Sequence, residues 1–312
     1  MTNIKKLGLT ALAGSLVATS AYAGELAVSG TAKLTYASQH DTETTGNPYS
    51  MSKGIGFSGS GDLDNGMAIA YQYTMTDAAF SSSSLKLDMG DTGTLSFSNG
   101  AGTTGISAYD DKMPTAGEEV WDDLDGQASG VATISNKGTI GYAGSFGPVG
   151  VSASYNKDDK ASPTTTAGSS HSLVVSMSPA DGVSAFIGTG DKSGSTANNG
   201  TDMYTAGVTY TAGAFTLGFQ TTDIDVSAVN GDTDRNHLAA SFAVNENMSI
   251  SYGMSTVGFE DPAKVDQEDA GVAVSYTMGS MTLGAFRNTS DDVGGTASAE
   301  DSVTEVSLAF AF

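Results

Sequence analysis

Apolar and polar residues alternate along most of the chain, and the alternation is clearest at its end. Over residues 301–312 one face is mostly apolar and the other is small or polar; the apolar face carries Thr304, Val306, Leu308, Phe310 and Phe312. A period of two indicates a β-strand whose faces meet different environments. Because this strand ends the chain, its edge needs a partner, and pairing with the first strand would close a barrel.

Sixteen segments show this alternation, and they are joined in turn by short turns and by longer polar loops. Strands of about ten residues tilted by about 45° span a membrane. The pattern predicts an all-β fold, a 16-stranded antiparallel transmembrane β-barrel; the alternative is a soluble β-sandwich or repeat-built adhesin. The apolar faces begin at Leu26, Met51, Met67, Leu85, Leu95, Ile140, Val151, Leu173, Val183, Tyr204, Phe215, Leu238, Met248, Ala270, Met281 and Thr304.

The N-terminus has the pattern of a secretory signal peptide. Lys5 and Lys6 precede an apolar stretch over 7–18, and Ala21 and Ala23 are the small residues that favour cleavage. We expect residues 1–23 to be removed and residues 24–312 to form the barrel. A membrane anchor is the alternative, but the apolar stretch is short for one.

Composition narrows the function classes. Without residues 1–23 the chain keeps 11 basic and all 35 acidic residues, so its formal net charge is −24, which argues against nucleic-acid or anionic-lipid partners. The absence of cysteine excludes thiol chemistry and disulfides. After the signal peptide no apolar run is long enough for a membrane helix, so a membrane-spanning form has to be a barrel.

These features together resemble a known family. The sixteen strands, the turn LDNGM followed by AIAYQYTM, the long link after the fifth strand and the terminal EVSLAFAF are similar to Gram-negative general porins, closest to the compact porins of α-proteobacteria. The resemblance implies a homotrimer in the outer membrane of a Gram-negative bacterium, surrounded by lipid. It also implies a third long loop that folds into the lumen. The chain differs in lacking the PEFGG pattern of enterobacterial porin loops and in having few arginines.

The link at residues 99–127 corresponds to that loop and is the longest stretch without alternation. A loop of this length in a compact domain is usually functional. We expect it to narrow the channel and present carboxylates to solutes; the alternative is a solvated acidic surface loop. It contains the only tryptophan, Trp121, and seven acidic residues: Asp110, Asp111, Glu118, Glu119, Asp122, Asp123 and Asp125.

The resemblance places basic residues on the opposite wall. By alternation Lys33, Lys86, Lys137, Arg235 and His237 lie opposite the apolar faces of their strands and point into the lumen. Each is alternatively a polar lumen side chain without a special role. Lys53 has the wrong parity unless its strand bulges.

Catalysis and metal binding find little support. The three histidines have no metal-ligand spacing, and no Gly-x-Ser-x-Gly motif is present. A serine paired with His237 across strands would be the enzyme alternative, but serines are abundant enough for such a pair to arise by chance. No cofactor is expected, and the alternative is a bound calcium ion; hard oxygen ligands are available from Asp122, Asp123 and Asp125 and from the loop residues Asp223 and Asp225.

The sequence therefore predicts a passive outer-membrane channel for ions and small hydrophilic solutes, not an enzyme. Its acidic lumen predicts a preference for cations that weakens at high salt. Two alternatives stay open, a solute-selective porin and a plugged barrel that acts as a surface adhesin or structural protein.

Overall fold

The structure, a computed structural model, describes most of the chain. The described residues are 26–40, 46–100, 103–110, 112–126, 130–131, 138–157, 168–193 and 200–312. The signal-peptide prediction at residues 1–23 lies outside them and stays a prediction. No helix in the described residues is long and apolar enough to cross a membrane.

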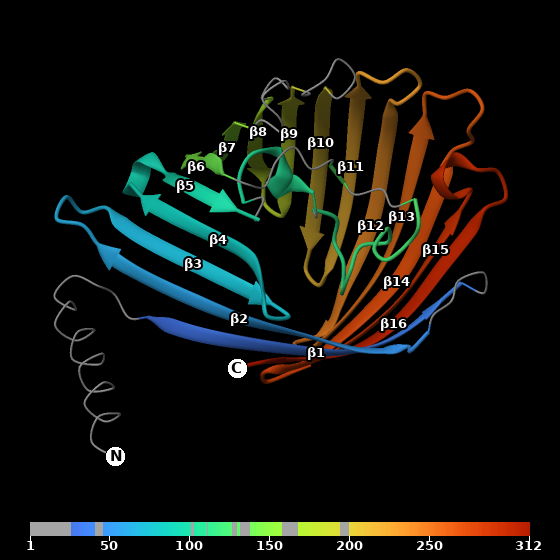
Figure 1. Ribbon diagram of the computed structural model, residues 1–312, viewed down its shortest axis with the longest axis horizontal. Helices are drawn as coiled ribbons and strands as arrows, with labels where there is room; N and C mark the ends of the chain where they lie inside the picture. The colour runs from blue at the N-terminus through green and yellow to red at the C-terminus, as the bar shows by residue number, and fades with distance from the viewer. Residues whose placement is uncertain are drawn as a thin grey trace, which may run out of the picture.

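Sixteen strands of the described chain form one closed antiparallel barrel, as predicted (Figure 1). Each strand pairs with its neighbours in sequence. The first eight strands are β1 (Ala27–Gln39), β2 (Tyr49–Asp62), β3 (Ala68–Thr76), β4 (Ala79–Asp88), β5 (Thr94–Asn99), β6 (Thr139–Phe146), β7 (Val149–Lys157) and β8 (Ser169–Ala180). The others are β9 (Val183–Lys192), β10 (Thr201–Ala212), β11 (Phe215–Val226), β12 (Thr233–Asn245), β13 (Met248–Phe259), β14 (Gln267–Met278), β15 (Met281–Asp291) and β16 (Glu300–Ala311).

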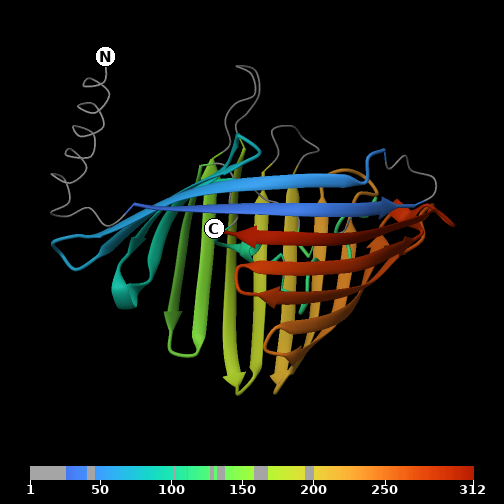
Figure 2. The ribbon, with the colours of Figure 1, turned by 90° about the horizontal axis from the view of Figure 1, so that it is seen from below.

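The last strand closes the barrel onto the first (Figure 2). β16 pairs with β1 in a register that places Leu34 opposite Leu308. At the chain end, Phe312 N donates to Gly30 O at 2.8 Å and Gly30 N donates to Phe312 O at 3.1 Å. The closure predicted from the terminal alternation is confirmed, and it removes the free sheet edge.

Side chains alternate between an apolar outer face and a polar inner face. Outward residues such as Leu34, Ile187 and Val272 are about half exposed, whereas inward positions carry many Ser, Thr and Gly residues. Lys53 shares the outward face with Met51 and is ion-paired with Asp77, 3.3 Å away, so β2 needs no bulge there. An apolar outer face and a polar inner face are typical of a barrel with lipid outside and water inside.

Short turns join the strands at one end and longer loops at the other, with one exception. The β3–β4 connection lies at the loop end but is a two-residue turn, in which Asp77 and Ala78 have φ of 51° and 69°. Two consecutive positive φ angles match the twist of a tight hairpin. In outer-membrane barrels the short turns face the periplasm.

The β5–β6 connection is the longest of all. It runs from residue 100 to residue 138 and contains the predicted stretch 99–127 except for Asn99, which ends β5. The described residues 103–110, 112–126 and 130–131 of this connection are called the inner segment below. They include the short 3₁₀ helix η2 (Ile106–Tyr109) and lie within the space that the strands enclose (Figure 1).

Candidate functional site: the inner segment and the lumen wall

The first part of the inner segment packs into an apolar cluster on the inner wall. Ile106 is fully buried and, with Val131, contacts Val174, Phe186 and Met203. These wall residues are inward positions of β8, β9 and β10, where an apolar side chain interrupts the polar pattern. The cluster fixes the start and the described end of the segment against one side of the lumen.

Wall hydroxyls hold the backbone next to this cluster. Gly105 N donates to Ser152 Oγ at 2.8 Å, and Ile106 N donates to Ser172 Oγ at 2.9 Å. Gly105 has φ of 65° and lies where a Cβ would collide with the Ser172 and Ser154 hydroxyls. The segment can therefore approach the wall this closely only with glycine at that position.

The middle of the segment is held by β11 and by its own Asp110. Gln220, which is fully buried, donates from Nε2 to Tyr109 O at 3.0 Å. Val131 N donates to Asp110 Oδ1 at 2.7 Å. Asp110 thus joins the two arms of the segment, a structural role that differs from the predicted role of presenting charge to solutes. Asp111 lies outside the described residues.

Trp121 is the central anchor. Its side chain is 2% exposed and packs with Met113 and Ala239, and its ring centroid lies 4.3 Å from that of His237. Ala116 N donates to Ser251 Oγ at 2.8 Å nearby. A buried aromatic side chain of this size contributes about 3–5 kcal/mol to the packing of its site.

The last part of the segment is bound by side chains of β15 and β16. Asn288 Nδ2 donates to Glu119 O at 2.9 Å and to Asp122 O at 3.1 Å. Asp125 N donates to Asp301 Oδ2 at 2.6 Å. The main chain around the predicted acidic residues is therefore fixed, and the positions of their carboxylates follow from it.

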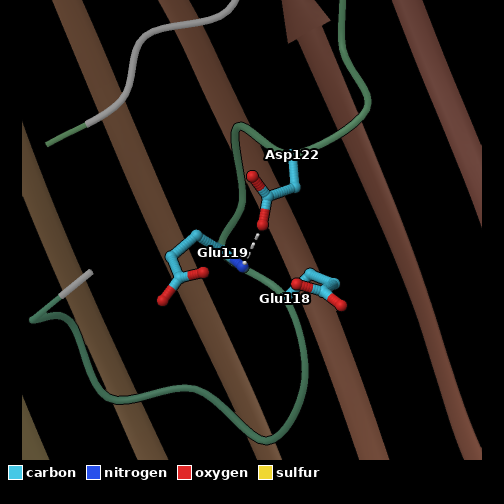
Figure 3. A group of neighbouring side chains, drawn as sticks. All are labelled: Glu118, Glu119 and Asp122. Atoms are coloured by element: carbon cyan, nitrogen blue, oxygen red, sulfur yellow. Dashed lines mark hydrogen bonds between the residues drawn. The ribbon is translucent and has the colours of Figure 1, made fainter. Parts of the chain in front are cut away.

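Three carboxylates gather at one point of the segment (Figure 3). Oxygen atoms of Glu118, Glu119 and Asp122 lie within 4.8 Å of one another, and Asp122 Oδ2 accepts from Glu119 N at 3.0 Å. Glu118 and Asp123 are exposed, as is Asp125. The segment therefore presents negative charge to the space inside the barrel.

The predicted calcium ligands Asp122, Asp123 and Asp125 do not form one group, and the other predicted pair, Asp223 and Asp225, lies apart from the segment on the exposed outward face of β11. In the described chain Asp122 groups with Glu118 and Glu119 rather than with Asp123 and Asp125. Asp123 has φ of 59°, which turns the chain between its neighbours. A calcium site would need six to eight oxygen ligands. Three neighbouring carboxylates in a polar lumen can also be hydrated without a bound metal ion.

The predicted basic residues do not form one wall opposite the segment. Lys33 on β1 reaches the segment itself, with Nζ 2.8 Å from Glu305 Oε1 and 3.7 Å from Glu118 Oε1. Arg235 and His237 lie on the inward face of β12, and His237 is covered by Trp121. Lys86 is exposed on β4, on the part of the wall that the segment leaves bare, beside Ser84 and Gln72. Lys137 lies outside the described residues.

The structure also reveals positions that the sequence reasoning missed. Gln220, Asn288, Asp301 and Glu305 are inward residues of β11, β15 and β16, each at most 7% exposed. Their parity alone could have marked them as lumen residues. Nothing in the sequence indicated that the inner segment covers them.

No catalytic arrangement emerges around His237. Its cross-strand neighbour is Ser255, but these side chains are 1% and 2% exposed, beneath the segment. A substrate has no access to such a pair, and a nucleophile must be reachable.

A closed barrel with an apolar belt, a polar lumen and a segment fixed inside it defines the chain as an outer-membrane β-barrel channel. The family model of Gram-negative porins matches residues 8–311, and the chain belongs to this family. The protein is therefore located in the outer membrane and forms a passive channel, and neither the family nor the fold is enzymatic. The chain matches no curated protein.

Solved porins share the fold. A loop-deletion mutant of OmpT of Vibrio cholerae is 14% identical, with 93% of this chain and 99% of that chain covered and a TM-score of 0.70. The anion-selective porin from Comamonas acidovorans is 16% identical over 93% and 100%, with a TM-score of 0.67. A mutant of Rh. blastica porin is 14% identical over 92% and 100%, with a TM-score of 0.63. At these identities the similarity establishes the fold alone.

Proposed function

We propose that this porin is a water-filled diffusion channel that passes ions and small hydrophilic solutes and prefers cations, with the inner segment as its constriction. The observation that carries the proposal is the set of exposed carboxylates of Glu118, Asp123 and Asp125 inside the barrel. Charges in a narrow, low-dielectric-walled passage raise the local concentration of counter-ions. Lys33 offsets part of this charge, since it lies between Glu118 and Glu305.

The selectivity has to come from these side chains rather than from the fold. The similar porin from Comamonas acidovorans is described as anion-selective, so the same barrel supports either sign. A net negative charge of −22 for the whole chain adds to the cation preference at the channel mouths.

The test is the reversal potential of the purified protein in a planar bilayer under a KCl gradient. We expect large ohmic steps and a cation-selective reversal potential, and we expect the triple variant E118Q/D123N/D125N to lose most of that selectivity. The matched control D64N/D181N/E246Q changes the same charge at exposed turns and should shift the reversal potential much less. Selectivity should also weaken from 0.1 to 1 M KCl, because the Debye length falls from about 10 to about 3 Å.

Other outcomes would contradict the proposal. An anion-selective reversal potential would reject the cation preference and keep the channel, and folded protein without steps would favour a plugged barrel. We propose no resident cofactor, so EDTA should leave the reversal potential unchanged. A clear shift with EDTA, reversed by CaCl₂, would instead support calcium at Glu118, Glu119 and Asp122.

We further propose that three copies assemble in the lipid bilayer. Besides the family resemblance, the support is Arg287, an exposed residue on the outward face of β15 whose Nη1 donates to Thr304 Oγ1 at 3.0 Å. A charge on a lipid-facing wall costs about 2–4 kcal/mol at the bilayer midplane, so a protein neighbour suits this face better than lipid. Native mass spectrometry in detergent should show trimers; monomers at all protein concentrations would reject this assembly.

A further inference from the structure

The lumen contains a second chemical environment beneath the inner segment, toward the short turns. A cavity of about 670 Å³ lies between the segment and the turn-end halves of β5–β10. Ligand pockets for small molecules typically range from about 300 to 1,000 Å³, so the cavity can hold a mono- or disaccharide with water. It is distinct from the carboxylate group of the segment, because Glu118, Glu119 and Asp122 are not part of its lining.

One corner of this cavity is aromatic. Tyr109 of η2 and Phe186 of β9 have ring centroids 4.8 Å apart at an interplanar angle of 52°. Gly207 on β10 lets the Phe186 ring lie against the wall, since a Cβ there would collide with the ring. Phe186 is 7% exposed and supports Tyr109, which is half-buried and forms part of the cavity lining. Tyrosine combines a large apolar ring with a hydroxyl group that can form hydrogen bonds.

Half of the other lining residues carry a hydroxyl group. Each can donate one hydrogen bond and accept two. Ser152 Oγ already accepts from Gly105 N at 2.8 Å, so its own proton can be donated elsewhere. The hydroxyl residues of the lining are Thr94, Thr103, Ser145, Ser152, Ser176, Ser184 and Thr209.

Charge separates this cavity from the constriction. Among the described residues that line it there is no Asp or Glu, although acidic residues outnumber basic ones by 35 to 13 in the chain. The charged residue among these described lining residues is Lys112, whose Nζ lies 5.2 Å from the Tyr109 ring centroid. Hydroxyl donors and acceptors around an aromatic corner match a neutral polyhydroxylated solute better than a cation.

We propose that this cavity is a subsite for neutral saccharides on the turn side of the constriction, formed by Tyr109 and the hydroxyls of Ser176 and Ser184. This inference rests on the proposed channel function and names a class of solute for it. A sugar ring would contact the aromatic corner, while its hydroxyls exchange water for the wall serines. Weak, reversible binding there would prolong the stay of a sugar in the lumen without stopping ion flow.

Sucrose is the probe. We expect sucrose to lower single-channel current in a saturable way, with added current noise, and to act faster from the turn side, because it then need not cross the constriction. A small polyethylene glycol of matched hydrodynamic size, which lacks the ring of hydroxyl donors, should lower the current only in proportion to its concentration. A linear response to sucrose as well would overturn the inference.

The variants locate the effect. S176A/S184A should raise the half-saturating sucrose concentration by about fivefold, as expected for the loss of one or two hydrogen bonds. The matched control S58A/S60A changes exposed serines on β2, which line a separate cavity of about 320 Å³, and should leave it unchanged. Y109L should raise the half-saturating sucrose concentration further. If that variant does not fold, the comparison of S176A/S184A with S58A/S60A still tests the subsite.

The outcomes separate this inference from the channel function. Absence of conducting steps would contradict the channel itself, whereas steps without saturable sucrose block would contradict only the subsite. Equal shifts in S176A/S184A and S58A/S60A would also reject the subsite, because binding would then not depend on this cavity.

Discussion

The two sides of the lumen wall differ in what happens to their inward polar residues. On β11–β15 the inner segment covers them, and Gln220, His237 and Asn288 are at most 2% exposed. On β2–β4, Gln72 and Lys86 also point inward, but they are exposed. The strand pattern is the same on both sides. Inward polar residues therefore lie under the inner segment on one side of this barrel and face the open lumen on the other.

This difference has an energetic basis. A polar group that loses water must find a hydrogen-bond partner, or the structure is destabilised by about 1–3 kcal/mol. Asn288 meets this requirement by donating to two carbonyls of the segment. On the bare side the side chains are exposed and can form hydrogen bonds with water, so we expect their identity to matter less for stability.

The largest expected effect comes from Trp121→Ala. Losing this buried side chain should destabilise the packing of the segment by about 3–5 kcal/mol. The barrel should still fold, because its strands pair without the segment, but the segment should leave the wall intermittently. We expect single-channel recordings with strong current fluctuations and a changed mean conductance. Trp121→Phe, which keeps most of the packing, is the control; steady wild-type current in the alanine variant would show that Trp121 is not the anchor.

The second-largest effect is expected for Asn288→Ala, with Gln72→Ala as the comparison variant on the other side of the wall. The first variant removes two hydrogen bonds to the segment, for a loss of about 1–3 kcal/mol. It should increase current noise and the rate of protease cleavage within the segment, whereas Gln72→Ala on the bare side should change neither. If both variants were equally noisy, the distinction between the two sides of the wall would not hold.

The fold was predictable from the sequence because each strand separates two media. The alternation of Val306, Leu308 and Phe310 against Glu305 and Ser307 already determines which face is which, and the structure follows it. The closure of the barrel followed from the same strand. Because successive side chains of a strand face lipid and lumen in turn, the alternation can be recognised in the sequence.

The candidate site was only partly predictable because the inner segment has no such period. The acidic residues between positions 118 and 125 could be recognised in the sequence, but the sequence did not show which of them are exposed inside the barrel. That depends on single hydrogen bonds across the lumen, such as the bond from Asn288 to Glu119 O, 169 positions apart in the sequence. For the same reason Lys33 was placed on an opposite wall, although it contacts Glu118 of the segment.

The smallest expected effect, and the sharpest comparison, concerns Lys33→Met and Lys86→Met. Both variants remove one positive charge from the lumen, so both should increase the cation preference modestly in reversal-potential measurements. Lys33 in addition pairs with Glu305, which is 7% exposed, whereas Lys86 lies on the bare side. Removing Lys33 leaves that buried carboxylate without its ion-pair partner and should also increase current noise.

The double variant K33M/E305Q separates charge from anchoring. It removes the unpaired carboxylate, so the noise should return toward the wild-type level, and the lumen charge is restored to its original value. Lys86→Met should show the selectivity change without added noise throughout. If Lys33→Met were as quiet as Lys86→Met, the ion pair with Glu305 would contribute nothing to holding the segment, and Lys33 would act only as a lumen charge.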